Sequence, residues 1–401
     1  MTPHEKLAAL PKRLYCYCFL AAVVTLPGLW LGVTHGHLSP VLGAIIYGVA
    51  VFGAAFMLSW AAEAAQMDIS QSLAIAILAL VAVLPEYAVD FVLTWKAAHH
   101  PQYMHYAIAN MTGANRMLIG LGWPVVLFLY LIVRKKGRLQ LHQSQRVEIF
   151  YLAMATIYSI SIPLKGSLNL FDTLVLVLLF VLYTRRAAQM ETTEPEPVGP
   201  VRIVAAFGKS ARRIITAGLF LYSGLVIFFV AEPFAESLIE SGKMLGINEF
   251  YLLQWLAPIA SEAPEFIVAA IWTLRGEAAA AMRALISSKV NQWTLLIGTI
   301  PLVYAIAGAR IQPFVLDTLQ DHELLLTSAQ SLFAVALLVD LHLSLVDGIL
   351  LLALFSAQLF VPAIRLESAA AYVLLAIYYH IIHRRCLIPA AKVGLGFKRW
   401  Q

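Results

Sequence analysis

Two Pro-Glu pairs interrupt apolar stretches of the sequence. Pro85-Glu86 follows an aliphatic run, and Pro264-Glu265 lies between the apolar runs YLLQWL and IVAAIW. A proline inside a helix removes one backbone hydrogen bond, and a charge at the bilayer centre costs about 2.5–3.5 kcal/mol on insertion scales. Such groups are tolerated where protein or a water-filled cavity receives them. The two motifs therefore predict two broken helices whose carboxylates and freed carbonyls bind a cation or a proton.

Each Pro-Glu motif is followed by a segment that contains asparagine. Asn110 and Asn115 follow Glu86, and Asn291 follows Glu265. Amide oxygens are ordinary ligands of hard cations such as calcium. Each segment then runs into glycine and proline, namely Gly120, Gly122 and Pro124 in the first half and Gly298 and Pro301 in the second. The order of these features predicts that the two halves are repeats.

The composition identifies the elements that must hold these residues. Of the 401 residues, 61% are hydrophobic and 13% are charged, whereas soluble domains carry roughly 25% charged residues. Apolar runs of about 20 residues recur along the chain, as transmembrane helices require, and the ten-residue alternation of a β-barrel is absent. The three cysteines form no disulfide or metal pattern. The chain is predicted to be an all-α polytopic membrane protein, and its net charge of +5 is attributed to loops rather than to nucleic-acid binding.

About twelve transmembrane helices are predicted. Most of the 28 lysines and arginines then fall on one side, which the positive-inside rule makes cytoplasmic and which holds both termini. The compact size and short loops favour a prokaryotic inner membrane. The predicted spans are 14–34, 41–62, 71–95, 104–133, 148–163, 168–184, 214–240, 250–274, 280–308, 324–341, 345–363 and 367–383.

The polar segment near the middle of the chain, rich in proline and acid, predicts a solvated cytoplasmic linker over 187–213. Repeats of five spans each insert with opposite orientation, an arrangement found in many secondary transporters. The predicted organisation is an N-terminal extra helix (1–40), a first five-helix repeat (41–186), the linker, a second inverted repeat (214–363) and a C-terminal extra helix with a basic tail (364–401).

These paired motifs resemble the α-repeats of the cation/calcium exchanger superfamily, which includes sodium/calcium and calcium/proton antiporters. The family pattern is roughly G-T-S-L-P-E on one helix and G-N-x-x-G-S-N on the next. The resemblance implies that Glu86 and Glu265 are the essential ion-binding glutamates. It implies supporting ligands from the amides and from Ser261, which matches the threonine of the motif. These are Asn110, Asn115, Asn291 and Ser261.

The chain also departs from the family pattern. Ala82 and Val83 replace two hydroxyl residues, and Glu262 replaces a serine and is taken as a further ligand. Ala114 and Val290 replace the serines of G-S-N. Two basic residues appear as well: Lys289 stands in place of a glycine, and Arg116 follows Asn115.

The basic residues are expected to balance or modify the charge of the site. Lys289 is interpreted either as a substitute for a sodium ion or as a titrating amine, with a snorkelling side chain or a structural ion pair as the alternative. Arg116 does not titrate and is expected to pair with Asp90 or a repeat glutamate. Asp90 lies four residues after Glu86, on the same helix face.

The sequence therefore predicts a secondary active cation antiporter that works by alternating access around Glu86 and Glu265 and is proton-coupled. The transported cation is calcium, sodium or a proton, no cofactor is expected, and the partners are inorganic cations and the lipid bilayer. An exchanger fold with lost or redirected ion specificity stays open as the alternative. An enzyme is not expected, because the zinc, phosphate and nucleophile-elbow motifs are missing.

Overall fold

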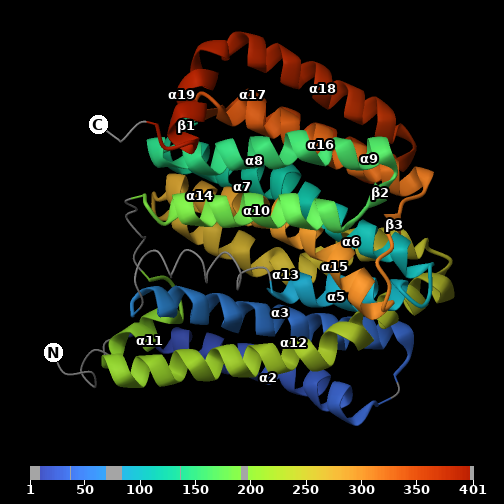
Figure 1. Ribbon diagram of the computed structural model, residues 1–401. Coiled ribbons are helices and arrows are strands. Elements are labelled where there is room, and N and C mark those ends of the chain that lie inside the picture. Colours follow the sequence, from blue (N-terminus) through green and yellow to red (C-terminus); the bar gives the residue numbers. More distant parts are fainter. Residues whose placement is uncertain (1–9, 37, 69–83, 136, 191–196, 398–401) are drawn as a thin grey trace. The chain divides into compact units, whose positions relative to one another are not determined.

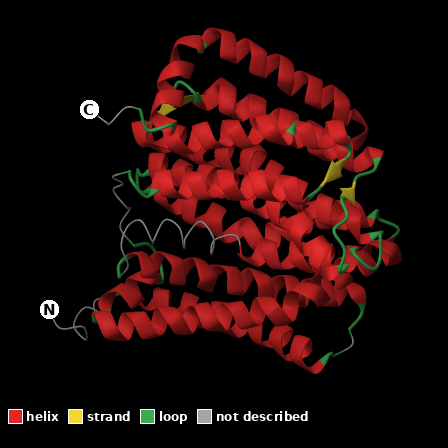
Figure 2. Cartoon of the chain, viewed as in Figure 1, coloured by secondary structure: helices red, strands yellow, loops and turns green. Residues whose placement is uncertain are grey.

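The computed structural model describes residues 10–36, 38–68, 84–135, 137–190 and 197–397, and it consists of helices with a few very short strands (Figures 1 and 2). Contacts divide the chain into two units. The first unit contains residues 1–93 and 195–267, and the second contains 94–194 and 268–401. Each unit thus takes part of both predicted repeats, and the repeat boundaries stay a prediction.

Three long helices form most of the first unit. They are α2 (Lys12–Thr34), α3 (Pro40–Gln66) and α12 (Lys209–Leu245), and they lie side by side (Figure 1). Glycine allows close approach: a Cβ on Gly32 would lie 2.5 Å from the carbonyl oxygen of Phe229. The unit also holds α11 (Val201–Ala206), residues 84–93 of α5 (Leu84–Ala97) and residues 249–267 of α13 (Glu249–Leu274).

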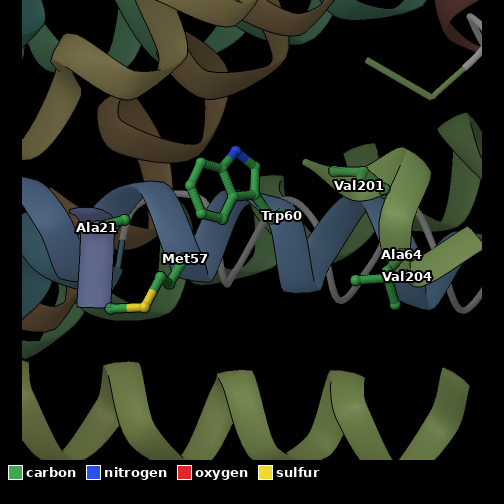
Figure 3. Close-up of a cluster of buried hydrophobic side chains, with 6 residues drawn as sticks. All are labelled: Ala21, Met57, Trp60, Ala64, Val201 and Val204. Carbon is green, nitrogen blue, oxygen red and sulfur yellow. The ribbon is translucent and has the colours of Figure 1, made fainter. Parts of the chain in front are cut away.

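The predicted linker is partly a packed helix. Val201 and Val204 of α11 are buried in an apolar cluster with side chains of α2 and α3 (Figure 3). The expectation of a solvated tether is therefore wrong for 201–206, because a run of aliphatic residues gains more from burial than from exposure. Residues 191–196 of the predicted linker lie outside the described part. The cluster consists of Ala21, Met57, Trp60, Ala64, Val201 and Val204.

Polar contacts also hold the ends of the linker to the end of α3. Glu63 Oε1 accepts a hydrogen bond of 3.0 Å from the Val198 amide. Arg212 donates from Nε and Nη2 to the two oxygens of Asp68, at 2.7 and 2.6 Å. The hydrogen bond from Arg212 lowers the pKa of the Asp68 carboxyl.

The Asp68 pair predicts a pH dependence of stability. A carboxyl whose pKa is lower in the folded state stabilises the protein above its unfolded pKa of about 3.9 and loses that contribution as the pH falls through the folded value. Asp68→Asn should lower the melting temperature at pH 7 by at most about 4 °C. The difference from wild type should shrink as the pH falls and vanish only below the lowered pKa of the folded-state carboxyl. Scanning fluorimetry of the purified protein measures this, with exposed Glu240→Gln as the control. A difference that is constant with pH would contradict the assignment.

The second unit is built around α16, which packs against α18, α8 and α6. Its first part follows the order α6 (Tyr103–Met117), η1 (Leu118–Gly122), α7 (Trp123–Arg134), η2 (Gln143–Gln145), α8 (Arg146–Ser159), α9 (Ser161–Lys165) and α10 (Leu170–Ala187). Its second part follows the order α14 (Ala278–Asn291), η3 (Gln292–Leu296), α15 (Ile297–Ala307), α16 (Thr318–Leu338), α17 (Leu345–Phe360), η4 (Pro362–Ile364), α18 (Arg365–Ile382) and α19 (Arg384–Gly394).

Two short strand pairs join the connections of the second unit. Strand β1 (Arg138–Gln140) pairs antiparallel with β4 (His342–Ser344), with Leu139 opposite Leu343. Strand β2 (Ser167–Leu168) pairs antiparallel with β3 (Phe314–Val315), with Leu168 opposite Phe314. The four opposed apolar side chains are buried. Connections that are far apart in sequence are thereby fastened to one another.

Each of the twelve predicted spans overlaps a described helix, but length and composition support a smaller number. Among the described residues, six helical segments are long and apolar enough to cross a membrane. A seventh arises if α17 and the segment Pro362–Ile382, which meet at a bend of 118°, count as one span. The number twelve and the inverted orientation stay predictions. The six segments are Lys12–Thr34, Pro40–Gln66, Tyr103–Arg134, Gln143–Lys165, Lys209–Leu245 and Ala278–Ala307.

Candidate ion-binding site

The second Pro-Glu motif lies on an uninterrupted helix. Helix α13 continues from Glu249 to Leu274 with Pro258 and Pro264 inside it. The predicted break is therefore wrong here. A proline removes one hydrogen bond, and surrounding protein supports the rest of the helix. The carbonyl of Ala260 still lacks the helical amide donor that residue 264 would otherwise supply, so it can contribute a ligand oxygen.

Three polar residues of the predicted site lie on α13. Ser261 and Glu262 are buried, and Glu265 is half-buried. The Ser261 hydroxyl lies 3.3 Å from the carbonyls of Ala257 and Pro258. Because the hydroxyl donates its proton to its own helix, its oxygen lone pairs stay available to a cation.

The first Pro-Glu motif lies at the start of the described part of helix α5, which begins at Leu84. Asp90 follows Glu86 one turn later, and both side chains are buried, at 2% and 1% exposure respectively. Residues 71–83 of the predicted third span, which include Ala82 and Val83, lie outside the described residues, so the break predicted before Glu86 is untested.

The asparagine segments form helices that continue into π-helical turns. Asn115 near the end of α6 precedes η1, and Asn291 at the end of α14 directly precedes η3. Asn110, Asn115 and Asn291 are all buried. Single π-helical turns are frequent at functional sites. The sequence did not predict them, although glycine and proline at matching places marked the region in both halves.

The structure brings Lys289 and Asn115 into direct contact. Lys289 Nζ donates to Asn115 Oδ1 at 2.7 Å and lies 3.3 Å from the Asn115 carbonyl oxygen. The ammonium also lies 4.1 Å from the centre of the Trp293 ring. Lys289 is completely buried, so the snorkelling side chain that the sequence allowed is ruled out.

Arg116 has a carboxylate partner that the sequence did not predict. Its guanidinium pairs with Glu323 of α16, and Nη1 donates to Gln358 Oε1 of α17 at 3.1 Å. Glu323 also pairs with Arg365 at the start of α18. The predicted span began at residue 324, which left Glu323 in a loop, whereas α16 begins at Thr318. Pairing of Arg116 with Asp90 or a repeat glutamate stays a prediction.

The predicted site residues are thus divided between the two units. The first unit contains Glu86, Asp90, Ser261, Glu262 and Glu265, and the second contains Asn110, Asn115, Arg116, Lys289 and Asn291. Within the described ranges, no group of three or more histidine, cysteine, aspartate or glutamate side chains is arranged to hold a metal ion. Within this set, Lys289 of the second unit donates to Asn115 of the same unit.

Comparisons with known proteins identify the family to which the chain belongs. The model of the sodium/calcium exchanger protein family matches residues 38–187 and 215–363. The chain is 41% identical to the H+/Ca2+ exchanger CAX, whose crystal structure it matches with a TM-score of 0.92 over 96% of this chain and 99% of that chain. No curated protein matches the chain significantly.

Two more distant structures share the fold. Native YfkE, a Ca2+/H+ antiporter protein, is 17% identical, with a TM-score of 0.60 over 91% of this chain and 99% of that chain. The sodium-calcium exchanger NCX_Mj, soaked with Na+ and Sr2+, is 16% identical, with a TM-score of 0.52 over 83% of this chain and 99% of that chain. At these identities the matches show the fold alone.

Proposed function

Because the chain belongs to the sodium/calcium exchanger protein family, we propose that it is a secondary active antiporter that exchanges calcium for protons across a membrane. The observation that carries the proposal is the 41% identity to an H+/Ca2+ exchanger over nearly the whole of both chains. The family and the apolar helices make the chain an integral membrane protein. The matched proteins are transporters rather than enzymes.

Carboxylates supply the chemistry of this exchange. Glu86 and Glu265 bind calcium when ionised and protons when neutral, so that one pair of groups carries either cargo in turn. Calcium takes six to eight oxygens, and Ser261, Glu262 and the amides of Asn110 and Asn291 would contribute the remainder, whereas Asn115 Oδ1 already accepts a hydrogen bond from Lys289. The burial of Glu86 and Glu262 supports this role, because buried acids in a membrane protein mark ion and proton pathways. Asp90 and Lys289 would balance the charge.

The strand pairing supports the inverted orientation of the repeats. Strand β1 follows α7 in the first half as β3 follows α15 in the second, and β2 and β4 correspond in the same way. Corresponding strands do not pair: β1 pairs with β4 and β2 with β3. This crossed pairing of strands is expected if corresponding connections of the two repeats lie at opposite ends of the helices, as an inverted orientation requires. Alternating access, an inner-membrane location and cytoplasmic termini belong to the same proposal.

Reconstitution of the full chain into proteoliposomes tests the proposed exchange. With an acidic lumen and calcium outside, a calcium indicator should report uptake and a pH indicator should report proton loss from the lumen. An ionophore that collapses the pH gradient should abolish uptake, and sodium or potassium gradients should not replace it. Uptake that needs a sodium gradient, or no uptake of any cation, would contradict the proposal and favour redirected specificity.

A further inference from the structure

The environment of Lys289 has the composition of a monovalent-cation site. Its ammonium contacts the Asn115 amide oxygen at 2.7 Å, the Asn115 carbonyl oxygen at 3.3 Å and, at 4.1 Å from its centre, the Trp293 ring, and these are among its contacts in the protein. Amide and carbonyl oxygens are ligands of hard cations, and an indole face attracts cations electrostatically. A sodium ion would use the same kind of groups.

These groups are fixed independently of the lysine. Asn115 Nδ2 donates to the Met111 carbonyl at 2.8 Å, which turns its Oδ1 towards the ammonium. Trp293 Nε1 donates to Ser159 Oγ at 3.1 Å, and Ser159 Oγ lies 3.0 Å from Ser328 Oγ. The ring is therefore held by α8 and α16. Such a preorganised surround should persist when the side chain at position 289 is shortened.

We infer that Lys289 is a tethered cation, whose ammonium permanently occupies a monovalent-cation position beside Asn115 and so excludes sodium and potassium from the protein. The inference rests on the proposed cation antiport, for which it identifies a residue that determines ion selectivity. The amine carries its charge on a covalent stem, so no dissolved monovalent ion can compete for the position.

Equilibrium binding to the purified full-length protein tests this without any transport. Lys289→Ala removes the ammonium and opens space lined by oxygen, whereas Lys289→Met removes the charge but fills the space with a stem of similar length. We expect saturable ²²Na⁺ binding to Lys289→Ala, and none to wild type or Lys289→Met. Sodium at about 100 times its dissociation constant should also raise the melting temperature of Lys289→Ala above that in choline chloride of equal ionic strength.

Two further measurements assign the bound ion to this position. Asn115→Leu in the Lys289→Ala background should remove the new sodium binding, because it removes the amide oxygen. Methylammonium should compete with sodium in Lys289→Ala, since it replaces the lost end of the lysine. If Lys289→Ala folds only when sodium or methylammonium is present, that result also supports the inference.

Other outcomes would overturn it. They are a folded Lys289→Ala that binds neither sodium, potassium nor methylammonium, and a Lys289→Ala that no cation restores to a folded state. Failure of the calcium/proton exchange assay would contradict the proposed function but not this inference, because sodium binding to the purified Lys289→Ala variant is measured without transport.

Discussion

We expect Glu265→Gln to reduce calcium uptake by the reconstituted protein to the level of protein-free liposomes, and Glu86→Gln to do the same. Each change keeps the shape of the side chain but removes both its charge and its ability to exchange calcium for a proton. Mutating residues that merely orient metal ligands already costs about 10- to 100-fold in affinity or activity. Loss of the carboxylate itself should cost at least as much.

A matched control separates loss of the site from loss of any buried acid. Glu148 of α8 is also buried and lies near Arg283, at 3.7 Å from its Nε, but belongs to neither Pro-Glu motif. Glu148→Gln should retain exchange if the protein folds. Folding of all three variants is checked by size-exclusion profile and melting temperature. Undiminished uptake in Glu265→Gln would remove Glu265 from the mechanism.

The second large effect concerns stability. Glu323→Gln should destabilise the protein by about 3–5 kcal/mol, because removing one partner of a buried ion pair leaves an uncompensated charge in the interior. Arg116 and Glu323 are exposed by 2% and 1%, so solvent screens the pair little. The loss should appear as a lower melting temperature in detergent and as earlier thermal aggregation.

A double variant shows whether stability depends on having both charges of the pair or on avoiding a single buried charge without a partner. Replacing a buried ion pair by apolar residues of similar volume is often close to neutral. Both Glu323→Gln and the double variant Arg116→Met with Glu323→Leu remove the carboxylate partner of Arg365, whose side chain is 15% exposed. Only the double variant also removes the buried charge of Arg116, so we expect it to be more stable than Glu323→Gln alone. Lys165→Met provides the control: it breaks the pair with Asp172, but Asp172 keeps donors from Tyr158 and the Asn169 amide. Equal losses of thermal stability in Glu323→Gln and Lys165→Met would argue against the explanation that the buried charge of Arg116 is left without a partner.

Local patterns in the sequence were sufficient to predict the helical class and the family of the chain. The apolar runs placed a helix at every predicted span, and the family membership expected from the Pro-Glu and asparagine motifs is confirmed. The break expected on α13 was wrong, because proline chemistry fixes only the missing hydrogen bond. Whether the helix bends or continues depends on neighbours that a single sequence does not show.

Contacts between distant segments were the part that could not be predicted. The ion pair of Arg116 joins α6 to α16, and no spacing rule connects residues so far apart. The contact of Lys289 with Asn115 likewise depends on how α14 and α6 pack. Helix α11 was not predicted, because the proline, glycine and acidic residues before it indicated a solvated linker and its own aliphatic run is short. Its burial against Trp60 is a tertiary effect (Figure 3).

The strand pairs β1–β4 and β2–β3 have a mechanical consequence. Strand β1, in the connection before α8, pairs with β4, in the connection between α16 and α17. Strand β2, before α10, pairs with β3, before α16. Both pairs combine backbone hydrogen bonds with buried apolar side chains. Helices α8, α10, α16 and α17 are therefore fastened where they begin, and sliding any of them along its axis would break a ladder. We expect these ladders to limit the sliding of the helices that they join, so that the proposed transport cycle draws its displacement from other segments of the chain.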